Sequence, residues 1–275
     1  MTGCTRALLD ALGGLSEAIV ENREWRYMLE EETRHSLSIE GYFATEQELK
    51  AVLGGRKRKP EILNYYRTAQ MLYELALQDY RGGTFRLDLS LIRHIHSELF
   101  RELVSARQRG RLRQGELTIT GASVRPPAFD LDRYLQAFCL YVTDCLERFN
   151  LLSALARTHA LFESIHPFDD GNGRVGRILQ NYIAISSGYP PLVIKGETEA
   201  QRQRYYSALE QADRGFHNGF PAPEVPSLEA HLEQGNFEPL EALLAEGLEP
   251  RLDAAIVGAC EDHYGLHPLQ ALAAH

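Results

Sequence analysis

One short stretch of the chain, residues 165–177 with the sequence IHPFDDGNGRVGR, combines residue types that a packed core does not need. His166 supplies an imidazole, whose ordinary pKa of about 6.5 suits a general base. Two adjacent aspartates follow it, and two arginines come three residues apart at the end. A base, carboxylates, glycines and guanidiniums within thirteen residues predict a site that binds an anion and removes a proton.

Two helices are expected to position this stretch. Pro167 disfavours helical geometry at His166, so a helix over residues 152–165 should end there. Helical spacing of apolar residues resumes after Arg174. The intervening DDGNG segment has residue types that reach positive φ, so its backbone N–H groups can converge into an anion-binding nest. Because this nest precedes a helix N-terminus, where the helix dipole also favours anions, we expect a phosphate there.

The charged residues of the stretch refine the predicted ligand. Arg174 and Arg177 share a face of the first helical turn, where cations oppose the helix dipole unless an anion is bound. Two arginines therefore indicate a polyphosphate. The aspartates beside it would repel that ligand unless a hard cation such as Mg²⁺ lay between them. Together these features describe the transfer of part of a nucleotide to a nucleophile.

The quoted residues also resemble a known family. HPFDDGNGR followed by VGR is similar to the Fic (FIDO) signature HPFx[D/E]GNGRxxR, and the resemblance extends over roughly residues 25–220. It implies a mainly α fold, a Fic-type helical core with one short β-hairpin flap. It also implies a protein adenylyltransferase, which transfers AMP from ATP to Ser, Thr or Tyr hydroxyls of target proteins. Gly173 in the GNGR form favours this transfer over the kinase-like chemistry of relatives with Lys there.

The resemblance assigns roles to individual residues. His166 would deprotonate the target hydroxyl, and Asp170 would hold Mg²⁺ (or Mn²⁺) against the α- and β-phosphates of the ATP co-substrate. Arg174 and Arg177 would clamp the β- and γ-phosphates. The nucleotide-binding residues expected in the signature are Asp170, Gly171, Asn172, Gly173, Arg174, Val175, Gly176 and Arg177. In RYYSALEQAD (204–213), Tyr205, Tyr206 and Asp213 are candidate adenine or ribose contacts, although tyrosines at these positions are equally consistent with core packing.

A second segment, LTITGASVRPP at 117–127, alternates as a strand, turns at Gly121, alternates again and ends at two prolines. The resemblance identifies this hairpin as the flap, which would bind a target segment by strand addition. The expected flap residues are Ile119, Thr120, Gly121, Ala122 and Ser123. The protein itself is a second candidate target.

Upstream, residues 36–41 read SLSIEG and resemble the inhibitory [S/T]xxxE[G/N] helix of many Fic proteins. The spacing places Ser36 and Glu40 on one helix face, and Gly41 is free to end the helix. The Glu40 carboxylate would pair bidentately with Arg177 and occupy the place of the γ-phosphate. We therefore expect an autoinhibited enzyme.

The rest of the chain is expected to be helical. Amphipathic helices are predicted over 60–80, 87–100, 130–149 and 152–165, and two or three short helices beyond a proline-rich linker at 221–226. We divide the chain into an N-terminal helical region with the inhibitory motif (1–84), a Fic core (85–222) and a C-terminal helical extension (223–275).

Composition excludes several other classes of protein. A net charge of −9 argues against nucleic-acid binding, and no segment is long and apolar enough for a membrane span. The four cysteines form no CxxC pair or zinc quartet, and the first residues lack the features of a signal peptide. We expect a cytoplasmic protein, and homo-oligomers are compatible with the sequence.

Three alternatives to adenylylation stay open. The same residues serve the removal of AMP from a modified protein, with Glu40 positioning water. Nothing in RYYSALEQAD excludes transfer of UMP or GMP. A nucleotide-regulated protein-interaction module is the alternative outside enzymes, and the intact His166 argues against it.

Overall fold

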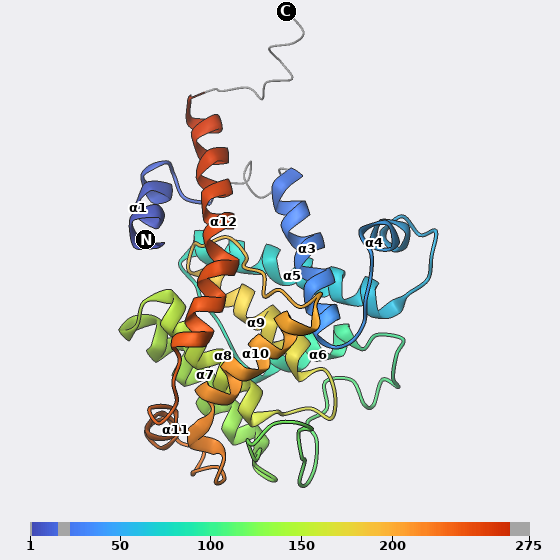
Figure 1. Ribbon diagram of the computed structural model, residues 1–275, viewed down its shortest axis with the longest axis vertical. Coiled ribbons are helices and arrows are strands. Elements are labelled where there is room, and N and C mark those ends of the chain that lie inside the picture. The colour runs from blue at the N-terminus through green and yellow to red at the C-terminus, as the bar shows by residue number, and fades with distance from the viewer. Residues whose placement is uncertain (1, 16–22, 265–275) are drawn as a thin grey trace, which may run out of the picture.

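The computed structural model describes residues 2–15 and 23–264, and these residues are mainly helical (Figure 1). The elements, in chain order, are α1 (Thr2–Ala11), α3 (Arg23–Ile39), α4 (Glu46–Leu53), α5 (Pro60–Gly82), α6 (Leu89–Leu99), α7 (Leu131–Arg148), α8 (Leu151–Ile165), α9 (Asn172–Ser186), α10 (Glu199–Ala212), the 3₁₀ turn η1 (Arg214–Phe216), α11 (Val225–Leu232) and α12 (Glu238–Tyr264). The four predicted helices are confirmed as α5, α6, α7 and α8.

Helix α9 lies at the centre of the molecule, packed against α5 and α8 (Figure 1). Every residue from Arg174 to Ile185 is buried, on all faces of the helix. A helix surrounded in this way is held by packing rather than by its own propensity. Its N-terminus, which carries the GNGR residues, is therefore fixed relative to α8.

The junction between α8 and α9 follows the expected pattern. Helix α8 ends at Ile165, and His166 adopts left-handed backbone angles (φ 49°, ψ 61°) immediately before Pro167. Gly171 also has a positive φ of 83°, and α9 begins at the next residue. Phe168 is fully buried between them and anchors the loop in the core.

The predicted β-hairpin at 117–127 is wrong. Within the described residues no β-strand is present, and this segment is extended chain around a turn. The turn has one backbone hydrogen bond, from Ala122 N to Ile119 O (3.2 Å). Beyond the turn the chain is bonded to other elements, because Arg125 N donates to Phe216 O (3.4 Å). Since an isolated two-stranded ribbon is marginal by itself, alternation alone did not produce a ladder.

The C-terminal extension also differs from expectation. It contains α11 and one long helix, α12, instead of two or three short helices. Pro250 lies inside α12. A buried stripe compensates for the hydrogen bond that the proline removes; its residues are Leu240, Leu244, Leu248, Leu252, Ala255 and Ala259. Helix α12 packs against α8, α10 and α1.

The division into three regions at residues 84 and 222 stays a prediction. Helix α5 of the expected N-terminal region packs directly on α9, and α12 of the expected extension packs on α8. Among the described residues, no helix combines the length and apolar character needed to cross a membrane.

Candidate active site

A cavity of about 430 Å³ brings together residues that are far apart in the sequence, between Glu40 and Asp213. Glu40 borders it from the end of α3, His166 from the end of α8, and Gly173 and Arg177 from α9. The turn segment 119–122 and the α10 face form the remaining walls. The predicted catalytic, inhibitory and flap segments thus meet around one space.

His166 is oriented by the backbone of its own helix. Its Nδ1 lies 3.1 Å from the Glu163 carbonyl oxygen. Because a carbonyl only accepts hydrogen bonds, Nδ1 must carry the proton, which leaves Nε2 as the basic nitrogen. Burial lowers the pKa of His166, so the imidazole is neutral at neutral pH. This is the state that a general base requires.

The loop after His166 is closed by Asn172. Phe168 N donates to Asn172 Oδ1 (2.9 Å), and Asn172 Nδ2 donates to Phe168 O (2.8 Å). The Asn172 amide is thereby occupied within the loop. A side chain at Gly171 would collide with the Phe100 ring, and its positive φ also disfavours other residues. Both features hold the turn that leads into the N-terminus of α9.

Arg113, which the sequence analysis did not identify, connects this loop to the segment that contains Gly115 and Pro127. Its guanidinium donates to four carbonyls, those of Gly115 (2.7 Å), Pro127 (2.7 Å), Ile165 (3.2 Å) and His166 (2.6 Å). It thereby satisfies the last carbonyls of α8. The only sequence signal for this role is an arginine among many in a glycine-containing loop.

Asp170 and Arg174 form an ion pair at the mouth of the loop. Arg174 Nη2 lies 3.0 Å from Asp170 Oδ1, and the buried guanidinium also lies over the Phe100 ring. The Asp170 side chain is 66% exposed. An exposed carboxylate beside a phosphate-binding helix terminus is a suitable oxygen donor for Mg²⁺, which keeps most of its coordination for water and phosphate. Asp170 borders a separate hollow of about 330 Å³ rather than the cavity of His166.

Arg177 is held by Ser36 and Glu40 of the predicted inhibitory motif. Its Nη2 donates to Glu40 Oε1 (2.6 Å) and to the Ser36 carbonyl (3.1 Å), and its Nε donates to Ser36 Oγ (2.6 Å). Both residues of the predicted pair therefore contact the arginine. The expected bidentate geometry is wrong, because Ser36 occupies the Nε edge and Glu40 uses one oxygen. Gly41, with φ 82°, ends the helix one residue later.

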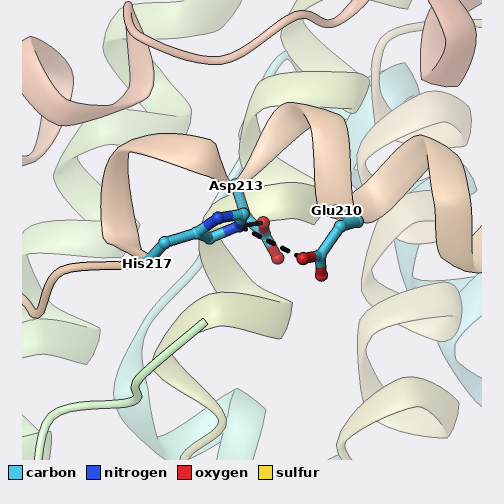
Figure 2. A group of neighbouring side chains, drawn as sticks. All are labelled: Glu210, Asp213 and His217. Carbon is cyan, nitrogen blue, oxygen red and sulfur yellow. Dashed lines mark hydrogen bonds and ion pairs between the residues drawn. The ribbon is translucent and has the colours of Figure 1, made fainter. Parts of the chain in front are cut away.

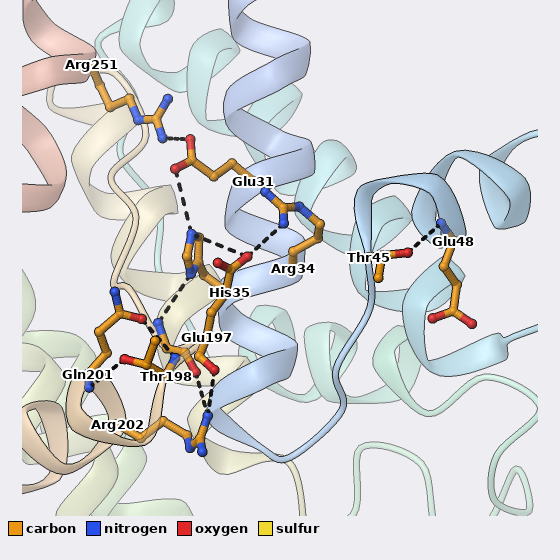
Figure 3. Close-up of polar contacts among 11 residues, drawn as sticks. Glu31, Arg34, His35, Thr45, Glu48, Glu197, Thr198, Gln201, Arg202 and Arg251 are labelled. Atoms are coloured by element: carbon orange, nitrogen blue, oxygen red, sulfur yellow. Dashed lines mark hydrogen bonds and ion pairs between the residues drawn. The ribbon is translucent and has the colours of Figure 1, made fainter.

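Helix α3, which carries the predicted inhibitory motif, is anchored from two directions (Figure 3). Arg251 of α12 contacts Glu31, and Arg34 Nη1 donates to Glu197 (2.7 Å) in the chain before α10. Gly196 N donates to His35 Nδ1 (3.3 Å). His35 and Arg251 lower the pKa of Glu31 to about 2, so this carboxylate stays ionised. The C-terminal helix thus helps to hold the segment that reaches Arg177.

The candidate nucleoside residues differ in their surroundings. Tyr205 is buried, and its hydroxyl lies 2.7 Å from His159 Nε2, so core packing accounts for much of its contact. Tyr206 is 44% exposed and donates to the Ile39 carbonyl (2.8 Å) at the end of α3. Both tyrosines line the cavity. Tyr206 therefore connects α10 directly to the end of α3.

Asp213 belongs to a group of three polar side chains on one face of α10 and η1 (Figure 2). His217 Nε2 lies 2.7 Å from Asp213 Oδ1 and 3.7 Å from Glu210 Oε1. Burial raises the pKa of Asp213 to about 6. The three side chains have ligand atoms within 4.8 Å of one another, a spacing that a metal ion would accept. The ion pair between Asp213 and His217 also explains why these side chains lie together without a bound metal ion.

The turn segment that replaces the expected hairpin forms one rim of the cavity. Ile119, Thr120, Gly121 and Ala122 line it, and Ser123 N donates to Glu210 Oε2 (3.1 Å). Of the eight nucleotide-binding residues expected in the signature, Gly173 and Arg177 line this cavity, whereas Asp170, Gly171, Asn172, Arg174, Val175 and Gly176 do not. Val175 is fully buried in the core, and Gly176 lies against the side chains of Phe162 and Glu163.

Comparison with known proteins agrees with this geometry. Residues 86–184 match the model of the Fic/DOC family. The chain is similar to a probable protein adenylyltransferase of Aquifex aeolicus (30% identical over 196 residues, 69% of this chain and 56% of that protein) and to protein adenylyltransferase Fic of Nematostella vectensis (34% over 107 residues, 38% and 24%).

The chain thus spans about half the length of the first relative and about a quarter of the second. Its fold is similar to that of a Fic-domain signalling protein from Bacteroides thetaiotaomicron (TM-score 0.72, 20% identity, 94% of this chain and 97% of that one). It also resembles Fic-1 of C. elegans (TM-score 0.68, 20% identity, 94% and 72%).

Proposed function

Because residues 86–184 match the model of the Fic/DOC family, we propose that the chain is a protein adenylyltransferase of that family. It transfers AMP from ATP to a Ser, Thr or Tyr hydroxyl of a target protein. The observation that carries this proposal is a neutral His166, with Nε2 as its basic nitrogen, in the same cavity as the N-terminal turn of α9. The adenylyltransferase names of the relatives support the same reaction.

The reaction proceeds by in-line displacement at the α-phosphorus. His166 Nε2 takes the proton of the target hydroxyl, its oxygen bonds to the α-phosphorus, and pyrophosphate leaves. The N–H groups at the start of α9 and the Arg177 guanidinium, once freed from Glu40, bind the phosphates. Asn172 holds the loop in this geometry by its two bonds to Phe168.

Asp170 is the residue that would hold Mg²⁺ or Mn²⁺. Its carboxylate is exposed and is paired through one oxygen to Arg174, so it can contribute a single oxygen ligand. A bound ion would neutralise charge on the α- and β-phosphates. Arg174 would then serve mainly to keep Asp170 in place.

The nucleoside and the target are assigned to two different segments that line the cavity. Tyr205, Tyr206 and Asp213 on the α10 side are the candidate contacts to adenine and ribose. Residues 119–123 are the candidate docking site for an extended target segment, whose backbone would pair with theirs. Their exposure and their few internal hydrogen bonds support this role.

Glu40 keeps the enzyme inactive until it is displaced. Its carboxylate accepts a hydrogen bond from Arg177 Nη2, the atom that would bind a γ-phosphate oxygen in the active state. The protein is thereby autoinhibited through α3. The cytoplasmic location, the homo-oligomers and the self-modification considered from sequence stay predictions.

Mass spectrometry tests the reaction. The Glu40→Gly protein, incubated with ATP, GTP or UTP and a cell extract depleted of small molecules, should add a mass equal to AMP to protein hydroxyls. Addition only from UTP or GTP would replace AMP by another nucleotide. Loss of AMP from a previously labelled target, without addition, would assign the reverse reaction. No change with any nucleotide or labelled target would contradict the enzyme.

A further inference from the structure

One buried carboxyl in the cavity has no role in the reaction described above. Glu163 lies on α8 one turn before His166 and lines the same cavity as Gly173 and Arg177. Its Oε1 atom is buried and has no hydrogen-bond partner among the described residues. Because an unsatisfied buried polar atom is costly, one that belongs to a residue lining a cavity calls for an explanation.

The carboxyl is held in this position by its surroundings. A methyl group at Gly176 would collide with Glu163 Oε1 and approach Phe162 Cδ1 to 3.1 Å. Glycine within a helix lowers stability by roughly 1 kcal/mol relative to alanine, so its presence at position 176 requires a structural reason. Space for the Glu163 carboxyl supplies that reason. The signature glycine at 176 is then explained by Glu163 rather than by direct contact with the nucleotide.

The charge state of Glu163 follows from burial and from the groups that face it. The groups that face it are Arg177 of α9, Glu40 at the end of α3, Tyr205 of α10 and His166 at the C-cap of α8. Burial raises the pKa of Glu163 to about 8. Arg177 opposes this rise and Glu40 adds to it. At neutral pH the carboxyl is therefore protonated, and it can donate as well as accept.

We propose that Glu163 is a further nucleotide-binding residue, whose protonated carboxyl donates a hydrogen bond to a phosphate oxygen of the bound nucleotide. This inference rests on the proposed function of the cavity. The cavity connects Glu163 with Gly173 and Arg177, which flank the place of the phosphates. An ionised carboxylate there would repel phosphate, whereas a neutral one supplies a donor without adding charge. In the state with Glu40 bound to Arg177, Oε1 is unpartnered and available.

Direct binding of ATP with Mg²⁺, measured by isothermal titration calorimetry, tests the proposal in the Glu40→Gly background. Glu163→Gln keeps a neutral donor of similar shape and should change the Kd by less than about threefold at pH 7, whereas Glu163→Ala should weaken binding about tenfold or more. Raising the pH to 9 should weaken binding more for the protein that retains Glu163 than for the Glu163→Gln variant, because only the carboxyl ionises. Glu147→Gln, an exposed residue of α7, is the matched control.

Equal affinities of the Glu163→Gln and Glu163→Ala variants, or the same pH dependence with Glu163 and with Glu163→Gln, would overturn the inference. Thermal melts establish that each variant is folded. Binding is measured without any transfer, so the two proposals fail separately. If ATP binds with this dependence on Glu163 and no AMP is transferred, the proposed function fails and the role of Glu163 stands.

Discussion

The two segments that border the cavity of His166 are held in different ways. The loop 166–172 is closed by the Asn172 amide, anchored by the buried Phe168 ring and bonded at its start to Arg113. The segment 117–123 has one turn hydrogen bond and one bond to the Glu210 side chain. The catalytic loop is thus fixed before any ligand arrives, whereas the flap segment has backbone groups still unpaired within the described chain.

This difference separates two tasks. Catalysis requires a base and a phosphate site placed before the reaction, because displacement of either by about 1 Å is costly. Recognition of a target by strand addition requires backbone donors and acceptors that the chain has left free. The changes below alter one segment or the other, and each has a different expected consequence.

Replacing the base should have the largest effect. His166→Ala in the Glu40→Gly background should lower the rate of AMP transfer by about 100- to 10,000-fold, because a general base contributes this much. Transfer is measured with ATP labelled at the α-phosphate, and the thermal melt should be nearly unchanged. Retention of more than a tenth of the rate would remove His166 as the base.

Removing the side chain of Arg113, which links the two segments, should have the second-largest effect. Arg113→Met leaves the carbonyls of Gly115, Pro127, Ile165 and His166 without their donor. The free energy of unfolding should fall by about 3 kcal/mol, as measured by urea denaturation. Arg111→Met, at an exposed neighbouring position, is the control and should change it by less than about 0.5 kcal/mol. Equal effects of the two substitutions would show that the Arg113 hydrogen bonds do not stabilise the folded protein.

The pH dependence of the rate sharpens the account of the catalytic loop. Burial lowers the pKa of His166, so its neutral form persists to a lower pH than that of an exposed histidine. As pH falls, the transfer rate of the Glu40→Gly protein should decline only below the ordinary histidine pKa of about 6.5. Single-turnover rates between pH 5 and 8 measure this limb. A midpoint above 6.5 contradicts a buried, neutral base.

Changes in the flap should have the smallest effects. The turn 119–122 has Gly121 at φ 82°, as a type II turn requires at its third residue. Thr120→Pro suits the second position of such a turn and should raise the free energy of unfolding by about 0.5 kcal/mol, whereas Gly121→Val should lower it by about 1 kcal/mol or more.

In the Glu40→Gly background, the Gly121→Val variant should also transfer AMP to a protein target several-fold more slowly, with the Kd for ATP unchanged. An equal loss of ATP affinity would mean that the segment contacts nucleotide rather than the target.

The difference between the loop 166–172 and the segment 117–123 also explains which features the sequence could predict. Residues 165–177 are informative because chemistry and turn geometry restrict each position, and the end of α8 at His166 followed directly from Pro167. The pairing of Glu40 with Arg177 was predicted, but its bidentate geometry was wrong, because the side-chain hydroxyl of Ser36 contacts the same guanidinium.

Other features depend on tertiary contacts that no local pattern reveals. Strand-like alternation at 117–125 did not produce a ladder, since its backbone groups bond to α10 and to Phe216 instead. Arg113 acquires its role from carbonyls of Ile165 and His166, about fifty residues away. The two or three short helices expected in the C-terminal extension are replaced by α11 and the long helix α12, which continues through Pro250 because a buried leucine stripe packs it against the core.

The central claim is that Glu40 holds an otherwise complete adenylyltransferase inactive through Arg177. The most direct measurement is the initial rate of AMP transfer by the wild-type and Glu40→Gly proteins at equal ATP and Mg²⁺. Loss of the charge-assisted bond to Arg177 should raise the rate by about tenfold or more. An equal or lower rate in the Glu40→Gly protein, with its fold intact, would contradict the account.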